Sequence, residues 1–179
     1  MKKNKLFKLV LIALLSACCF VAFRFIKLSY PPVLTVHLGN AFCILAALLI
    51  DGVSGGICGV IGMGIGDLLD PLYIHAFPKT VLCKMTMAIV TGVCARYAFK
   101  NLSEKKRIFL SILCGVTANI IMEFFFGFIY SKFLLHNLDK TLVLFIASKA
   151  PSVLITSLVS LFAAYFLYFP LYNRLKSKI

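Results

Sequence analysis

Long apolar runs separated by short polar breaks dominate the chain. A membrane-spanning helix needs about 20 apolar residues, and the runs predict six such helices, at residues 6–26, 34–50, 53–69, 78–98, 107–130 and 141–169. Turn-forming residues lie in the breaks, as at Tyr30-Pro31-Pro32 and Asp51-Gly52. Because the connections are short, we expect residues 1–179 to form a single all-α integral membrane domain, a bundle of six transmembrane helices.

The composition excludes an ordinary soluble protein. Apolar residues make up 61% of the chain and charged residues 14%, with a mean hydropathy of +0.99. A soluble domain is about half apolar and a quarter charged. The seven cysteines lie within apolar runs and form no C-x-x-C pair, so we interpret them as small hydrophobic residues rather than as a disulfide framework.

The net charge of +13 comes from 19 basic residues, and their placement along the chain predicts the orientation of the helices. Lys and Arg accumulate in the cytoplasmic segments of membrane proteins. With a cytoplasmic N-terminus, 12 of the 19 basic residues lie inside, and both termini face the cytoplasm of a bacterial cell membrane. No basic run is interleaved with exposed aromatic residues, so we expect no nucleic-acid partner.

The first apolar run has a second interpretation. Leu15-Ser16-Ala17-Cys18 fits a bacterial lipoprotein cleavage site. The apolar residues continue through Phe23, however, and no hydrophilic mature domain follows. We therefore expect an intact membrane-spanning helix.

Small residues are concentrated in the first and third predicted helices. Seven of the eleven glycines lie between Gly52 and Gly66, several of them four residues apart. Such spacing lets helix backbones approach closely in a membrane, which predicts tight internal packing. Ala13 and Ala17 repeat the spacing in the first helix, where either internal packing or a partner helix is consistent with it.

A partial match to an enzyme motif fails at specific positions. Asp51-Gly52, with Asp67 and Asp70, resembles the D-G-x-x-A-R…D-x-x-x-D pattern of membrane phospholipid-head-group transferases. Gly55-Gly56 stands where Ala-Arg is required, and the last two carboxylates are three residues apart instead of four. We therefore expect no enzyme.

Ionisable residues within predicted spans indicate function, because charges in a bilayer are costly. Asn119 and Glu123 share one face of the fifth helix, being four residues apart. Lys149 lies about 12 Å, or roughly eight residues, below the outer surface on the sixth helix, at a depth similar to that of Glu123. Lys84 is about six residues deep on the fourth helix. These charges predict either internal ion pairs or an outward-facing cavity for a small anionic or strongly polar molecule.

Further polar residues are expected near the same outer surface. His37 and Asn40 open the second predicted helix, and Asp67, Tyr73 and His75 lie at the outer end of the third. The histidines do not have metal-ligand spacing, so we expect ligand contacts rather than a metal site or a cofactor.

The stretch from His37 to Lys84 resembles the S components of energy-coupling-factor (ECF) transporters. The resemblance is carried by Pro-Pro-Val-Leu-Thr-Val-His37-Leu-Gly39-Asn40, by the run from Asp51-Gly52 to Gly66-Asp67-Leu-Leu-Asp70-Pro71, and by Pro78-Lys79-Thr80-x-x-x-Lys84. In the family, a small-residue pair like Ala13 and Ala17 docks onto a transmembrane T component. Lys149 sits where several members place a ligand-contacting residue. The chain has no Trp, unlike members that stack their ligand on one.

The resemblance implies capture of a small water-soluble vitamin at the outer surface, followed by toppling in the membrane against a T component and two ATP-binding subunits. The chain has no G-x-x-x-x-G-K-[ST] motif, so ATP hydrolysis falls to these partners. Pantothenate, a form of vitamin B6 and riboflavin remain open as ligands. The alternatives are a membrane-embedded enzyme using Glu123 and Asp67, or a structural membrane protein whose charges are internally paired.

Overall fold

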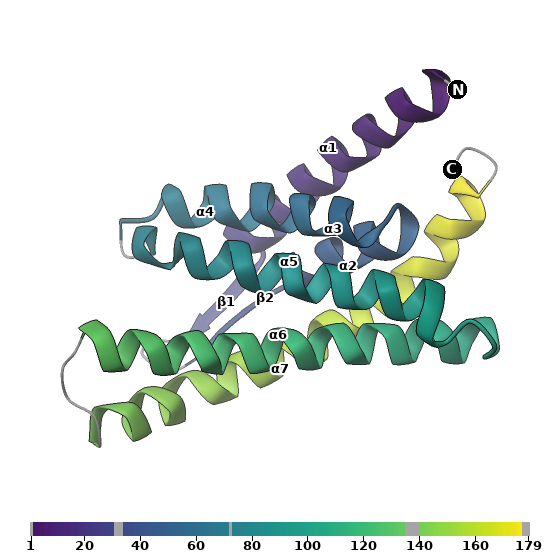
Figure 1. The fold of residues 1–179 in the computed structure, drawn as a ribbon. Helices are drawn as coiled ribbons and strands as arrows, with labels where there is room; N and C mark the ends of the chain where they lie inside the picture. The colour runs from purple at the N-terminus through teal and green to yellow at the C-terminus, as the bar shows by residue number, and fades with distance from the viewer. Residues whose placement is uncertain (1, 31–33, 72, 135–139, 177–179) are drawn as a thin grey trace.

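The computed structural model describes residues 2–30, 34–71, 73–134 and 140–176, which form a helical bundle with one small hairpin (Figure 1). In chain order the elements are α1 Lys2–Arg24, β1 Lys27–Tyr30, β2 Leu34–His37, α2 Gly39–Leu49, α3 Gly52–Gly59, the π-helical segment η1 Val60–Gly64, α4 Ile65–Leu68, the 3-10 turn η2 Ile74–Ala76, α5 Phe77–Val93, the π-helical segment η3 Cys94–Ala98, α6 Glu104–Leu134 and α7 Lys140–Leu175. The two chain ends lie at the same end of the bundle (Figure 1).

The helices have the length and composition of a multi-pass membrane protein. Four stretches in the described residues are long and apolar enough to cross a bilayer: Lys5–Arg24, Ile74–Ala98, Glu104–Ile129 and Lys149–Leu175. Two shorter apolar helices, Gly39–Leu49 and Gly52–Leu68, lie between the first and second of them. The predicted all-helical membrane class is therefore confirmed.

The short helix α2 is the centre of the bundle. It packs against α1, α3, α5 and α7, and Cys43, Ile44 and Leu45 are fully buried. A helix that is apolar all round is stable only when neighbours cover every face. The longer helices therefore surround α2 and present their apolar outer faces to lipid.

Glycines in α3 let its backbone approach α2, α5 and α1 closely. A methyl group added at Gly55 would lie 2.6 Å from the backbone nitrogen of Ala47 in α2, and one added at Gly56 would lie 2.4 Å from the sulfur of Met85 in α5. Further along, Gly62 faces Cys19 of α1 in the same way. The tight internal packing predicted from the glycine spacing is confirmed.

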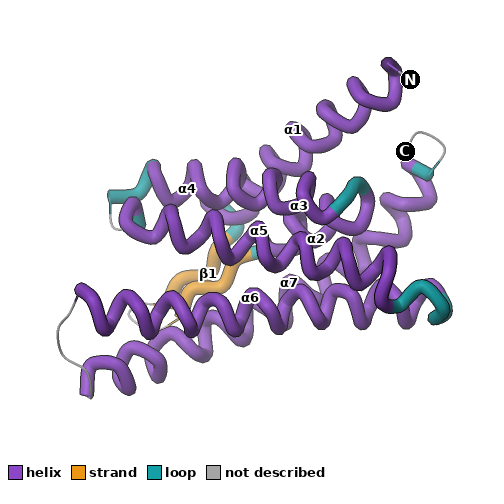
Figure 2. Tube along the Cα trace, viewed as in Figure 1, coloured by secondary structure: helices purple, strands orange, loops and turns teal. Residues whose placement is uncertain are grey.

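The outer part of the second predicted span is not helical. Residues 34–50 were expected to form one helix, but Leu34–His37 is a strand that pairs antiparallel with Lys27–Tyr30, and α2 begins only at Gly39. The strands, orange in Figure 2, lie among the helices. The β-branched pair Thr35-Val36 favours a strand, and the apolar run alone did not separate the strand from the helix that follows. The predicted turn at Pro31-Pro32 lies outside the described residues.

The turn between α2 and α3 fixes α1 to the bundle. Asp51 caps α3 by accepting a hydrogen bond from the backbone nitrogen of Ser54 at 2.7 Å, and it forms an ion pair with Lys8 of α1 at 2.5 Å. Arg96 donates a hydrogen bond to the backbone carbonyl of Ile50. Partial burial would raise the pKa of Asp51, but the hydrogen bonds from Lys8 and Ser54 lower it to about 2. Asp51 is therefore ionised at physiological pH.

We expect Gly55→Ala to destabilise the protein and Gly64→Ala to be tolerated. A Cβ at Gly55 meets backbone atoms of Ala47, whereas a Cβ at Gly64 meets only the ring of Phe77. Overpacking of this kind costs about 1–3 kcal/mol, and the gain in helix propensity of about 1 kcal/mol is common to both variants. Thermal unfolding of the detergent-solubilised variants measures the difference. A melting temperature for Gly55→Ala at or above that of Gly64→Ala would contradict the close approach.

Candidate ligand-binding site

A cavity of about 250 Å³ lies between the hairpin and the helices around it. Eight of the nine predicted site residues line it: His37, Asn40, Asp67, Tyr73, Lys84, Asn119, Glu123 and Lys149. The ninth, His75, is exposed on η2 and is not part of the lining. Residues from widely separated parts of the sequence thus meet at one place.

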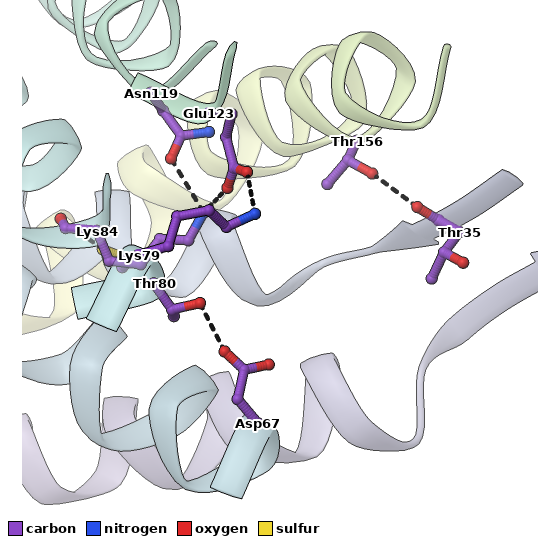
Figure 3. A network of polar contacts seen from close by, with 9 residues as sticks. Thr35, Asp67, Lys79, Thr80, Lys84, Asn119, Glu123 and Thr156 are labelled. Carbon is purple, nitrogen blue, oxygen red and sulfur yellow. Dashed lines mark hydrogen bonds and ion pairs between the residues drawn. The ribbon is translucent and has the colours of Figure 1, made fainter. Parts of the chain in front are cut away.

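Glu123 of α6 is shared by two lysines of α5. Its Oε2 lies 2.7 Å from Nζ of Lys79, and its Oε1 lies 3.5 Å from Nζ of Lys84 (Figure 3). Lys84 also donates to Oδ1 of Asn119 at 3.0 Å. Only 6% of the Lys84 side chain is exposed, so its charge requires these partners.

The predicted convergence of Lys84, Asn119 and Glu123 is therefore correct, whereas Lys149 is not a buried neighbour of Glu123. Lys149 is exposed at the edge of the cavity, and the described residues show no ion pair between it and Glu123. Lys79, which was not among the predicted site residues, forms the ion pair with Glu123 instead. It lies in the first turn of α5, where its long side chain extends to α6.

Two more polar contacts strengthen the cavity wall. Thr80 donates to the Asp67 carboxylate at 2.5 Å, joining α5 to α4, and Asp67 is only 4% exposed. At the end of α1, Arg24 forms an ion pair with Asp70 at 3.2 Å. Thr80 and Arg24 were also missed, although Thr80 precedes Lys84 by four residues and so shares its helix face.

The hairpin closes one side of the cavity and is hydrogen-bonded to α7. The backbone nitrogen of Thr35 donates to Oγ of Ser152 at 3.1 Å, and the backbone carbonyl of Thr35 accepts from Ser152 and, at 3.3 Å, from Thr156 (Figure 3). The ring of His37 packs edge-on against Phe23 of α1 at 4.9 Å. The hairpin is thus held between α1 and α7.

Two buried polar atoms in the cavity wall have no hydrogen-bond partner among the described residues. They are Nδ1 of His37 and Oδ1 of Asn40. Buried polar atoms are almost always hydrogen-bonded in native proteins. A molecule in the cavity is the partner that these two atoms fit.

The described residues hold no group of three His, Cys, Asp or Glu side chains placed to bind a metal ion. Ammonium, carboxylate, hydroxyl and amide groups in the lining form hydrogen-bonded pairs, and the imidazole Nδ1 of His37 and the amide oxygen of Asn40 lie beside them without a partner in the residues that the structure describes. This arrangement suits recognition of a polar organic molecule.

Ala13 and Ala17 lie on the opposite side of α1 from its packed face. Both are exposed, whereas Leu11 and Leu15 are buried against the bundle. Of the two interpretations of the small-residue pair, internal packing is excluded by this exposure. A smooth strip of small side chains remains available to another helix.

Comparisons with known proteins agree with this geometry. A family model described as "ECF-type riboflavin transporter, S component" matches residues 3–174. A solved structure of the S component of a bacterial ECF transporter superposes with a TM-score of 0.65 over 96% of this chain and 99% of that one, at 24% sequence identity. At this identity the second match shows the fold alone. No curated protein matches the chain in sequence.

We expect Glu123→Gln to destabilise the protein far more than Lys79→Gln. Removing the carboxylate leaves Lys84 buried and unpaired, which costs about 3–5 kcal/mol. Lys79 is 36% exposed, so removing its charge costs about 1 kcal/mol or less. Thermal unfolding in detergent, without added ligand, measures both changes. Equal melting temperatures would show that the Lys84–Glu123 pair does not hold α5 against α6.

Proposed function

Since the chain belongs to the family of ECF-type riboflavin transporter S components, we propose that its cavity binds a small water-soluble vitamin at the outer face of the cell membrane for uptake. The observation that carries this proposal is the cavity itself, with the unpartnered atoms of His37 and Asn40 in its wall. Buried polar atoms without partners are uncommon in native proteins, and two of them in one cavity wall support a bound ligand. The family model covers nearly the whole chain, so the proposal concerns the entire protein.

The lining residues have distinct proposed roles. Asn40 and His37 hydrogen-bond the ligand, and Lys84 with Asn119 presents a fixed, partly neutralised charge beside them. Glu123 holds Lys84 in place, and the Asp67–Thr80 bond keeps the outer ends of α4 and α5 together. Tyr73 and Lys149 lie at the exposed edge, where they contact the ligand as it enters. His75, outside the lining, has no proposed contact.

We propose no catalytic role for these residues. Asp67 and Glu123, the acid/base groups of the enzyme alternative, are already engaged by Thr80 and by two lysines. Movement of the ligand across the membrane therefore requires energy from outside the chain. We propose that a transmembrane T component and two ATP-binding subunits supply it, as in other members of the family.

We further propose six transmembrane helices with both termini in the cytoplasm. The stretch Gly52–Leu68 and the short helix Gly39–Leu49 are added to the four longer spans. The chain ends lie together in Figure 1, which an even number of crossings produces. The basic residues near both ends support the cytoplasmic side.

Cysteine labelling from outside the cell tests this orientation. In a background without the native cysteines, His75→Cys should react with a membrane-impermeant maleimide in intact cells, because His75 is exposed on the proposed outer side. Lys105→Cys and Lys176→Cys should react only after permeabilisation. Labelling of Lys105→Cys in intact cells would reverse the orientation and place the cavity on the wrong side for capture.

We expect Ala13→Trp and Ala17→Trp to abolish uptake without weakening ligand binding. Both side chains are exposed on α1 and lie outside the cavity lining, so a bulky ring there blocks a partner helix but leaves the ligand site intact. Uptake is measured in cells that express the partner subunits. Binding is measured on the purified protein, with the ligand that co-purifies and is identified by mass spectrometry.

The matched control is Leu14→Trp, since Leu14 is also exposed on α1 but is already bulky. This variant should retain uptake. If Ala13→Trp retained full uptake, α1 would not be the docking surface. If the wild-type protein bound and transported no vitamin, the proposed function itself would be wrong.

A further inference from the structure

Building on the proposed capture function, we infer that the ligand carries an acid group, a carboxylate or a phosphate, that lies between Lys27 of β1 and Lys149 of α7. The same ligand presents a hydrogen-bond donor to Asn40 deeper in the cavity. The family description names riboflavin, which has no acid group. The inference therefore concerns how this chain selects among related nutrients.

The charges around the cavity are unequal. Among the described residues, its lining contains five cationic side chains and three carboxylates: Arg24, Lys27, Lys79, Lys84 and Lys149 against Asp67, Asp70 and Glu123. In a recess with low-dielectric walls, such an excess concentrates the field on whatever occupies the space. A neutral occupant leaves this excess unmatched.

Three of the five cations already have carboxylate partners. Arg24 pairs with Asp70, and Lys79 and Lys84 share Glu123. Lys27 and Lys149 form no ion pair within the described part of the chain. The excess positive charge is therefore located on two particular lysines, both exposed at the edge of the cavity.

These two lysines lie on either side of the hairpin contact with α7. Lys27 is directly opposite His37 in the β1–β2 pairing. Lys149 precedes Ser152 by three residues, about one helical turn, and Ser152 is hydrogen-bonded to the backbone of Thr35. Thr35 and His37 are two residues apart along one strand, roughly 7 Å. Both flexible side chains line the same cavity, and on the inferred placement one acid group contacts both.

At its inner end, the cavity requires a hydrogen-bond donor from the ligand instead of an acid group. Oδ1 of Asn40 is a buried acceptor without a donor among the described residues, and Asn40 is 3% exposed. A hydroxyl, amide or ring N–H group of the ligand satisfies it. The occupant that fits is consequently a bipolar molecule, with a donor inside and an acid group at the edge.

Matched neutral and anionic probes test the inference. The purified full-length protein is titrated calorimetrically with three pairs: riboflavin and riboflavin 5′-phosphate, pyridoxine and pyridoxine 5′-phosphate, and pantothenol and pantothenate. In whichever pair binds, we expect the anionic member to bind about tenfold or more tightly. The first two pairs report on a phosphate and the third on a carboxylate. The advantage should shrink at high salt, because exposed charges are screened.

Lysine variants locate the effect. Lys27→Gln and Lys149→Gln should each weaken binding of the anionic member about fivefold, the upper end for an exposed charge pair, and weaken binding of the neutral member less. Lys105→Gln is the matched control, an exposed lysine outside the cavity. Since Lys27 and Lys149 are exposed, both variants are expected to fold, and their melting temperatures verify this.

The possible failures are distinguishable. If a neutral member bound as tightly as its anionic partner, the acid-group inference would be overturned and the proposed function would stand. If anions were preferred but both lysine variants retained the preference, the placement between Lys27 and Lys149 would be wrong. If no member of any pair bound, the proposed vitamin capture would fail, and the inference that rests on it would fail as well.

Discussion

A lysine buried in a membrane bundle must have a carboxylate beside it, and the cavity of this protein depends on that requirement at Lys84. Glu123 meets it from the neighbouring helix and accepts a second lysine, Lys79, at the same time. The shared carboxylate holds α5 against α6 and places Asn119 next to the ammonium group. With this wall fixed, the hairpin closes the opposite side of the cavity through its hydrogen bonds to α7.

The helices could be read from the sequence because a bilayer requires long apolar segments. The hairpin could not, since its second strand, Leu34–His37, belongs to the same apolar run as α2. A run of apolar residues indicates an apolar environment but not the backbone conformation. The strand packs among the helices, so its environment is as apolar as that of α2. Thr35-Val36 was the available signal, and it was too short to outweigh the run.

Most of the candidate site was also predictable, because charged residues are rare in membrane-spanning segments and each one there is a candidate functional residue. Residue counting gives the depth of a side chain but not the direction in which it points around the helix axis. Lys149 was therefore expected near Glu123, whereas the structure places it at the exposed edge of the cavity. Lys79 was overlooked because it lies at the end of α5, where a lysine is ordinarily solvated, and only the fold shows its side chain meeting Glu123.

The hydrogen bonds between the hairpin and α7 use side chains on one partner only. Thr35 contributes its backbone nitrogen and carbonyl, whereas Ser152 and Thr156 contribute hydroxyl groups. A substitution of the residue-35 side chain therefore leaves both bonding atoms in place. The β2 strand can change its side chains, and with them the chemistry facing the cavity, while remaining attached to α7. The attachment of the hairpin thus depends on two hydroxyl groups of α7 and not on the identity of the β2 side chains, which leaves those side chains free to differ in chemistry.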